Sequence, residues 1–273
     1  MTRIIDNPWA APSADLNEVA LLAVDVGFSD KRPTTGLAWS IRGQVGSAVA
    51  GRSWAARQLH IPKEIGFALT AIDGPLVGAA DRRDHKRTCE TVFARRPFAR
   101  RCKPGFSHFG TGLQLRDAAR ATADQVAALT AHRTSGDHRC LVRKEAIVEA
   151  FPNTFLGVLL DDGVYAKAPK LRRGERFDWL YGQAVEEGRF EHLMASIGWQ
   201  NAPFLARLHK ETHHERRAAL VCLLTAACAY TGRTTVVGDP VGGWFWLPPR
   251  SIWAPWALTG LRAILPGQMH PHG

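Results

Sequence analysis

The sequence predicts an α/β protein, and two kinds of pattern carry this prediction. Short apolar runs at residues 19–26, 67–72 and 146–151 suit strands that are buried on both faces of a sheet. Longer segments at residues 112–133 and 202–231 carry apolar residues at helical spacing. Because strands and helices occur in one chain, we expect a sheet with helices packed on it.

The first strands predict an antiparallel meander. A polar leader at residues 1–18 precedes the first apolar run, and a turn-rich segment follows it. Two further strands are expected at residues 37–41 and 44–53. Residues 54–66 are a helix candidate that Pro62 interrupts.

The later part of the chain contains the remaining strands and helices. The second apolar run ends at Asp73 before a Gly-Pro turn, and the third carries Glu149 and is stopped by Pro152. Residues 161–199 are polar and broken by glycines, which indicates an insertion with one or two helices. A Gly-Gly turn within residues 235–248 predicts a terminal hairpin.

The length bounds the domain organisation. A chain of 273 residues without visible repeats suits one large domain with insertions or two small domains. We expect a leader at residues 1–18, a single domain at 19–248 with a basic insertion at about 79–111 and a polar insertion at about 161–200, and a C-terminal tail at 249–273.

The composition is that of an ordinary globular protein. With 45% hydrophobic and 22% charged residues, it excludes disordered, collagen-like and low-complexity chains. The first 18 residues mix charges with prolines, unlike a secretory signal, so we expect a cytoplasmic protein. The longest apolar run, residues 218–230, is shorter than the roughly 20 residues that cross a bilayer, so we expect a buried helix and no membrane partner. Five cysteines without a C-x-x-C pair predict reduced core thiols.

Most of the formal net charge of +10 lies in one segment. Residues 82–103 hold nine Lys and Arg residues against two acidic residues, a local net charge of +7. One interpretation is a solvated helix face, because basic pairs repeat at i, i+4. The other is a surface that contacts phosphates, since guanidinium groups bind phosphate oxygens bidentately. The candidate nucleic-acid-binding residues are Arg82, Arg83, Lys86, Arg87, Arg95, Arg96, Arg100, Arg101 and Lys103.

Aromatic residues accompany the basic segment. Phe93, Phe98, Phe106 and Phe109 lie in it or close to it. They could stack on bases. They could equally anchor the segment to the core, which is the role that we expect.

Three acidic residues lie at or near the ends of predicted core strands: Asp25, Asp73 and Glu149. Carboxylates beside a core are costly unless they are paired, hydrogen-bonded or bound to metal. If they converge, they suit Mg²⁺ or Mn²⁺, which activate water for phosphodiester cleavage. Each acid also has a simpler interpretation: Asp73 as a turn residue, Glu149 as an exposed strand residue, and Asp25 as an acceptor for loop amides.

Other catalytic patterns are absent from the sequence or weak. It contains no H-E-x-x-H, no G-x-S-x-G and no Walker-type loop. The D-x-G at residues 25–27 is similar to the first phosphate loop of actin-like ATPases and sugar kinases.

Taken in order along the chain, these motifs resemble a family of predicted nucleases with an RNase H-like fold, within the RuvC and RNase H-like superfamily. The resembling segments are residues 21–39, 70–78, 87–105, 148–156, 219–227 and 238–248. The resemblance implies a mixed sheet of about five strands that opens with a short antiparallel meander and is flanked by helices.

The resemblance also implies a metal site. It places the first metal-binding aspartate at Asp25, the second at Asp73 and a further acid at Glu149. Such nucleases usually add an aspartate on the final helix, where this chain has Arg217 or Ala218. The nearby acids that could replace it are Glu215 and, about one turn earlier, Glu211, of which Glu215 is better placed.

The resulting hypothesis is a cytoplasmic nuclease that binds Mg²⁺ or Mn²⁺ and hydrolyses phosphodiester bonds in DNA or RNA. Its catalytic and metal-binding residues would be Asp25, Asp73, Glu149 and Glu215. A basic nucleic-acid-binding protein that has lost cleavage is the main alternative, supported by the altered final helix. A third hypothesis is a small actin-like ATPase or kinase. That architecture generally needs two RNase H-like halves, and the sequence shows one set of motifs.

Overall fold

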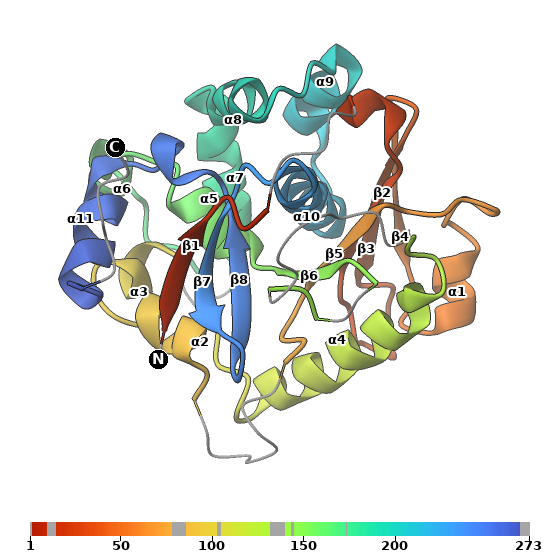
Figure 1. Ribbon diagram of the computed structural model, residues 1–273, viewed down its shortest axis with the longest axis horizontal. Coiled ribbons are helices and arrows are strands. Elements are labelled where there is room, and N and C mark those ends of the chain that lie inside the picture. The colour runs from red at the N-terminus through yellow and green to blue at the C-terminus, as the bar shows by residue number, and fades with distance from the viewer. Residues whose placement is uncertain are drawn as a thin grey trace.

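A central eight-stranded mixed sheet organises the computed structural model, which describes residues 2–9, 15–77, 86–102, 105–131, 140–142, 145–172 and 174–267 (Figure 1). The strands are β1 (Arg3–Asp6), β2 (Leu21–Asp25), β3 (Thr35–Ile41), β4 (Gln44–Ala50), β5 (Leu69–Asp73), β6 (Ile147–Ala150), β7 (Thr235–Asp239) and β8 (Gly243–Leu247). Their spatial order is β1-β7-β8-β6-β5-β2-β3-β4.

Helices cover both faces of the sheet. They are α1 (Trp54–Gln58), α2 (Thr88–Phe93), α3 (Phe98–Arg101), α4 (Thr111–Ala127), α5 (Pro152–Gly157), α6 (Asp162–Ala166), α7 (Glu175–Glu186), α8 (Arg189–Ile197), α9 (Ala202–Lys210), α10 (His214–Tyr230) and α11 (Pro255–Ile264). The α/β class predicted from the sequence is therefore confirmed.

The strand pairing combines a meander with parallel strands. Strands β2, β3 and β4 form the predicted antiparallel meander, and β2, β5 and β6 run parallel to one another. The predicted terminal hairpin is also present as β7 and β8. The expected number of about five strands is wrong, because this hairpin joins the same sheet beside β6 and β1 pairs with β7. Strand β1 lies within the expected leader. It is four residues long, which is too short to produce a clear alternation of apolar and polar residues.

The helical predictions need smaller corrections. Helix α4 ends at Ala127, before the predicted limit of residue 133. The segment 202–231 forms two helices, because the Glu211 carboxylate accepts the backbone N–H groups of Thr212 and His213 between α9 and α10. The polar insertion contains α6, α7 and α8 rather than one or two helices.

The central strands are buried on both faces, as their apolar runs predict. Successive side chains in a strand point to opposite faces of the sheet. On β2 and β5, Ala23 and Ala71 belong to the cluster that includes α10. On the same strands, Leu22 and Ile72 belong to the cluster that includes α4. The strands thus alternate between an α10 face and an α4 face of the sheet.

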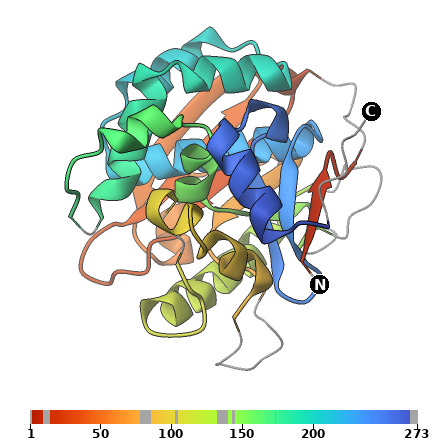
Figure 2. The same ribbon diagram turned by 90° about the vertical axis from the view of Figure 1, so that its left-hand side faces the viewer.

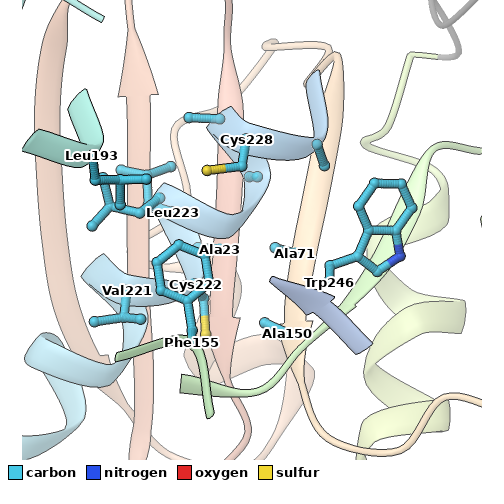
Figure 3. Packing of buried hydrophobic residues seen from close by; sticks show 14 of the residues in the cluster. Ala23, Ala71, Ala150, Phe155, Leu193, Val221, Cys222, Leu223, Cys228 and Trp246 are labelled. Carbon is cyan, nitrogen blue, oxygen red and sulfur yellow. The ribbon is translucent and has the colours of Figure 1, made fainter. Parts of the chain in front are cut away.

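Helix α10 lies directly on the sheet. Its residues from 218 to 230 are all buried, which confirms the predicted buried helix. The sheet offers alanines beneath it, which allow a close approach; Figure 3 shows Cys222 and Cys228 of α10 over Ala23, Ala71 and Ala150. All five cysteines are buried, as predicted. Among the described residues, no helix is long and apolar enough to cross a membrane.

A third cluster joins the basic segment to the end of the chain. Phe93 of α2 and Phe98 of α3 are fully buried against β7, β8 and α11, so these two rings anchor the segment as expected. Phe98 lies 5.4 Å from Trp256 of α11, measured between ring centroids. Figure 2 shows α11, in dark blue, on this side of the molecule.

Candidate active site

Two aspartates end adjacent parallel strands in register. Asp25 is the last residue of β2 and Asp73 is the last residue of β5, and the two are paired across the strands. Each aspartate lies two residues after an alanine of its strand, Ala23 or Ala71, that packs on the α10 face. Because side chains two residues apart in a strand point to the same face, both aspartate side chains point to the α10 face. The carboxyl ends of parallel strands are where α/β folds commonly bind ligands. The sequence-predicted convergence of these two acids is present in the structure.

A glycine brings a third acid to the same edge. Gly36 of β3 pairs with Asp25, and a Cβ atom at position 36 would lie 2.0 Å from the backbone carbonyl oxygen of Glu215. Only the absence of a side chain therefore lets the first turn of α10 rest on the strand. Glu215 is in this turn, close enough for its charge to raise the pKa of Asp25. Its Oε2 lies 3.1 Å from Nδ1 of His213.

Asp25 and Asp73 are carboxylates whose surroundings raise their pKa values. Among the described residues, no side chain or backbone group forms a hydrogen bond or ion pair with either carboxylate. Burial raises the pKa of Asp25 well above its usual value, and the charges of Asp73 and Glu215 raise it further. Burial and the charge of Glu149 raise the pKa of Asp73 to about 7. The pair thus favours a bound proton or a bound cation.

Cys222 of α10 closes the buried side of this site. Burial raises the pKa of its thiol well above the usual value, and the charges of Asp73 and Asp25 act in the same direction. The thiol is therefore neutral and contributes an uncharged surface beside the aspartates.

Glu149 lies on the other side of the sheet. Glu149 is paired with Ile72 of β5, whose side chain points to the α4 face. Paired residues of neighbouring strands point to the same face, so the Glu149 side chain also points to the α4 face. Its two carboxylate oxygens accept hydrogen bonds from Arg87 at 2.8 and 2.7 Å, and Oε2 also accepts the backbone N–H of Leu76 at 3.0 Å. The side chain is 4% exposed. Glu149 is therefore not grouped with Asp25 and Glu215 as the sequence hypothesis expects.

Arg87 is an internal residue rather than a surface residue. Its side chain is 1% exposed and its guanidinium donates to Glu149, to Glu90 and to the backbone carbonyl of Gly242. This differs from the expected role in nucleic-acid binding, because two buried carboxylates already hold the cation. Sequence reasoning gave no role to Glu90, although the spacing of Arg87 and Glu90 at i, i+3 on a helix is a recognisable signal.

The other basic candidates differ in exposure. Arg82, Arg83 and Lys103 lie outside the described residues. Arg101 is partly buried over the rings of Trp256 and Tyr165, at 4.2 and 5.2 Å from their centroids. The exposed candidates are Lys86, Arg95, Arg96 and Arg100.

The contacts at the start of α10 show what the other candidate residues of this region do. Glu211 accepts backbone N–H groups and pairs with Arg216 at 3.1 Å, and these contacts lower its pKa although burial opposes them. Glu211 is therefore occupied as a cap. Arg217, which stands where the family resemblance implies an aspartate, donates to the backbone carbonyl of Glu211 and to Asp178. Ala218 is buried. Of the candidates in this part of the chain, Glu215 is the acid that acts on Asp25.

The carboxylates of Asp25 and Asp73 can supply some, but not all, of the ligands of a Mg²⁺-like ion. In the described part of the chain, no three or more Asp, Glu, His or Cys side chains are grouped closely enough to form a metal cage. Magnesium is usually held by one or two carboxylates together with waters and substrate phosphates. The unpaired oxygens of Asp25 and Asp73 fit this partial coordination.

A pocket of about 210 Å³ adjoins Asp73. It lies at the carboxyl ends of β5 and β6 and extends to the start of α4. Its lining residues are Phe28, Asp73, Gly74, Pro75, Arg87, Glu90, Gly105, Phe106, Ser107, Thr111, Gly112, Leu115, Glu149, Ala150, Phe151 and Phe245.

Comparison of this chain with protein-family models, with curated proteins and with solved structures found no match. The fold and the acids at the strand ends are therefore the basis for a functional proposal.

Proposed function

We propose that this protein is a cytoplasmic, divalent-metal-dependent nuclease with an RNase H-like fold, which hydrolyses phosphodiester bonds in nucleic acid. The observation that carries the proposal is the pair Asp25 and Asp73, side by side on adjacent strands with no neutralising cation from the described part of the chain. Two neighbouring carboxylates that lose hydration repel each other unless a proton or a metal ion separates them. In a metal-dependent nuclease, a bound divalent cation takes this place.

The sheet topology supports the proposed fold. Strands β2 to β6 consist of an antiparallel meander followed by two parallel strands, which is the arrangement that the resemblance to RNase H-like nucleases implies. Strands β1, β7 and β8 extend this arrangement beyond β6. Helix α10 crosses β2, β3 and β5 and brings Glu215 to Asp25.

Asp25 and Asp73 would hold Mg²⁺ or Mn²⁺. When bound, such an ion activates a water molecule and neutralises charge on the phosphate. The two aspartates must lose their protons to take this role, and the cation then offsets their repulsion. Glu215 adds a third carboxylate, whose Oε2 lies 3.1 Å from Nδ1 of His213. Glu149 supports the site from the opposite face through Arg87.

The exposed basic residues would hold the nucleic acid. Lys86, Arg95, Arg96 and Arg100 present their charges to solvent. Cationic side chains that neutralise phosphates release counterions, so binding of this kind weakens as salt increases. DNA and RNA share the backbone chemistry on which this contact depends.

A second candidate function is nucleic-acid binding without cleavage. It is favoured by Arg217 and Ala218 at the position implied for an acid, and by the lack of a closed metal cage among the described residues. An actin-like ATPase or kinase is less well supported. The described residues form one such sheet, whereas that architecture generally needs two RNase H-like halves.

The test is a cleavage assay with labelled single-stranded and double-stranded DNA, RNA and hybrid, each with Mg²⁺, Mn²⁺ or EDTA. We expect metal-dependent cleavage that falls more than about 100-fold in Asp25→Asn and Asp73→Asn, beyond the 10–100-fold typical of residues behind a metal ligand. Asp117→Asn on α4 is the matched control, since this carboxylate is exposed and lies away from the pair. Binding without cleavage in any metal would contradict the nuclease and favour the second candidate.

A further inference from the structure

The pocket beside Asp73 has aromatic walls. Phe28, Phe106, Phe151 and Phe245 line it, and Leu115 of α4 adds an aliphatic surface. Phe151 and Phe245 stack on each other with their centroids 4.9 Å apart. Flat π-faces of this kind receive planar rings, and nucleobases stack on them whatever their sequence.

The size of the pocket limits its occupant. Its volume of about 210 Å³ lies below the roughly 300–1,000 Å³ of pockets that enclose drug-sized ligands. One ring system therefore fits, whereas a whole dinucleotide does not. The aromatic and aliphatic walls also suit a flat ring better than a free sugar or phosphate, which would lose its hydration there.

Ser107 adds a polar side chain to the lining of the pocket. Ser107 is 3% exposed, and its backbone N–H donates to Glu90. Its hydroxyl has no partner among the described residues, and a hydroxyl both donates and accepts. Arg87 holds the nearby carboxylates of Glu90 and Glu149 in ion pairs. A serine hydroxyl in the lining can bond the polar edge of a ring.

One wall of the pocket belongs to the candidate active site. Asp73 lines the pocket and is also paired with Asp25. In a nucleotide, only the sugar separates the base from its phosphates. A ring held in the pocket therefore lies beside Asp73, and its phosphodiester extends to the strand ends that carry the aspartate pair.

We propose that this pocket binds an unpaired nucleobase of the substrate strand, next to the phosphodiester that is cleaved. The proposal rests on the nuclease function and specifies its substrate class as single strands, or duplexes with a base that is easily flipped out. A fully paired duplex must first unstack and unpair the base, and this cost is smallest for a mismatched or single-stranded base.

The first experiment measures cleavage of a labelled single strand in which one nucleotide at a time, on each side of the cleaved bond, is replaced by an abasic site. Stacking lost per base corresponds to a roughly 5- to 150-fold effect. We expect one abasic position to slow cleavage by the wild-type protein within this range. Phe106→Ala should slow cleavage of the intact strand and erase the abasic effect. Equal cleavage of intact and abasic strands at every position would overturn the proposal and leave the nuclease function standing.

Two further variants make the result independent of folding defects. Leu115→Trp narrows the pocket from a partly exposed position and should act like Phe106→Ala. Phe109→Ala is the matched control, because this ring is 58% exposed, stacks near Phe106 and does not line the pocket. We expect the control to behave as wild type, and all three variants to be checked by thermal unfolding.

The second experiment does not need cleavage. Binding of intact and abasic single strands to Asp25→Asn protein is measured by fluorescence anisotropy in EDTA, with and without Phe106→Ala. We expect weaker binding of the abasic strand and a loss of this difference in the double variant. If wild-type protein cleaves nothing, this result still supports the pocket while the nuclease proposal fails. Binding that ignores the base at every position overturns the pocket, whatever the outcome of the cleavage assay.

Discussion

Two groups of acids lie at the same end of the sheet and differ in whether a cation of the described residues neutralises them. Glu149 and Glu90, on the α4 side, share the guanidinium of Arg87. Asp25 and Asp73, on the α10 side, have no cation among the described residues. Burial raises the pKa of Glu149, and the charge and hydrogen bonds of Arg87 lessen this rise without cancelling it. The pKa of Asp73 meets no such opposition and rises to about 7.

The difference teaches how to distinguish structural from functional carboxylates in one sheet. A buried carboxylate with an arginine on both oxygens is satisfied, and its loss is felt mainly as lost stability. A carboxylate without such a partner needs a proton or a ligand from solution. By this criterion Glu149 belongs to the framework of the site, and Asp25 and Asp73 belong to its chemistry.

Removing the guanidinium should have the largest effect on stability. Arg87→Met leaves two buried carboxylates without their cation, so we expect the free energy of unfolding to fall by about 3–5 kcal/mol. Urea denaturation measures this change. Adding Glu149→Met to Arg87→Met should restore part of the loss, because one of the unpaired charges is removed. A loss below about 1 kcal/mol in the single variant, a value typical of exposed pairs, would contradict the framework role.

Gly36→Ala tests how the third acid is positioned. The new methyl group would meet the carbonyl oxygen of Glu215 at 2.0 Å, so the start of α10 must move away from β3. We expect a loss of about 1–3 kcal/mol in stability, as for other overpacked sites. Cleavage should fall roughly 10–100-fold, as when residues behind a metal ligand change. Gly51→Ala is the control, because its Cβ would make an ordinary contact at 3.4 Å. Equal behaviour of the two variants would show that Glu215 does not need this close approach.

The pH dependence of stability tests the unpaired aspartates. Because the folded pKa of Asp73 lies near 7 and its unfolded value lies near 4, the folded protein holds a proton that the unfolded chain has released between these values. The free energy of unfolding of the metal-free protein should therefore fall as the pH rises from about 4 to about 7. Asp25 acts in the same direction, while Glu149 and Glu215 are the other acids that act on the pair.

Chemical denaturation across this pH range measures the effect. We expect a fall of more than about 1 kcal/mol, the equivalent of one pKa unit, that is smaller in Asp73→Asn. Mg²⁺ should raise the melting temperature more at about pH 8 than at about pH 5, since the metal requires deprotonated carboxylates. A metal effect that is the same at both pH values, or in Asp73→Asn, would place the ion elsewhere.

The smallest expected effect concerns the exposed basic residues. Arg95→Ala with Arg96→Ala should weaken nucleic-acid binding several-fold. It should also reduce the slope of log affinity against log salt by about one for each phosphate contact that is lost. Lys210→Ala is the control, because this residue is exposed and its helix, α9, lies apart from α2 and α3 in Figure 1. An unchanged salt slope in the double variant would remove these arginines from the binding surface.

Local patterns in the sequence were sufficient for many elements. The apolar runs that contain Leu22 and Ile72 predict strands covered on both faces, and both strands are present. The same patterns place Asp25 and Asp73 at strand ends. They do not report the width of the sheet, because strand β1 and the hairpin of β7 and β8 join it through pairing between residues far apart in the chain.

The candidate site shows the same division. Asp25, Asp73 and Glu149 stand out in the sequence because each is an acid beside an apolar run. Arg87 stands out only as one of nine basic residues in its segment. Its distance along the chain from Glu149 hides their ion pair, and its charge suggests a surface position that the structure does not give it.

The sequence by itself determined the α/β class, the buried strands and helix, and the position of Asp25 and Asp73 at strand ends, because these depend on local alternation of apolar and polar residues. Only the tertiary structure decided which acids are neutralised. That outcome depends on which face of the sheet each side chain occupies and on whether a distant arginine reaches it. The close approach of α10 to Gly36 and the pocket beside Asp73 have the same origin, since each is formed by segments that meet only in the folded chain.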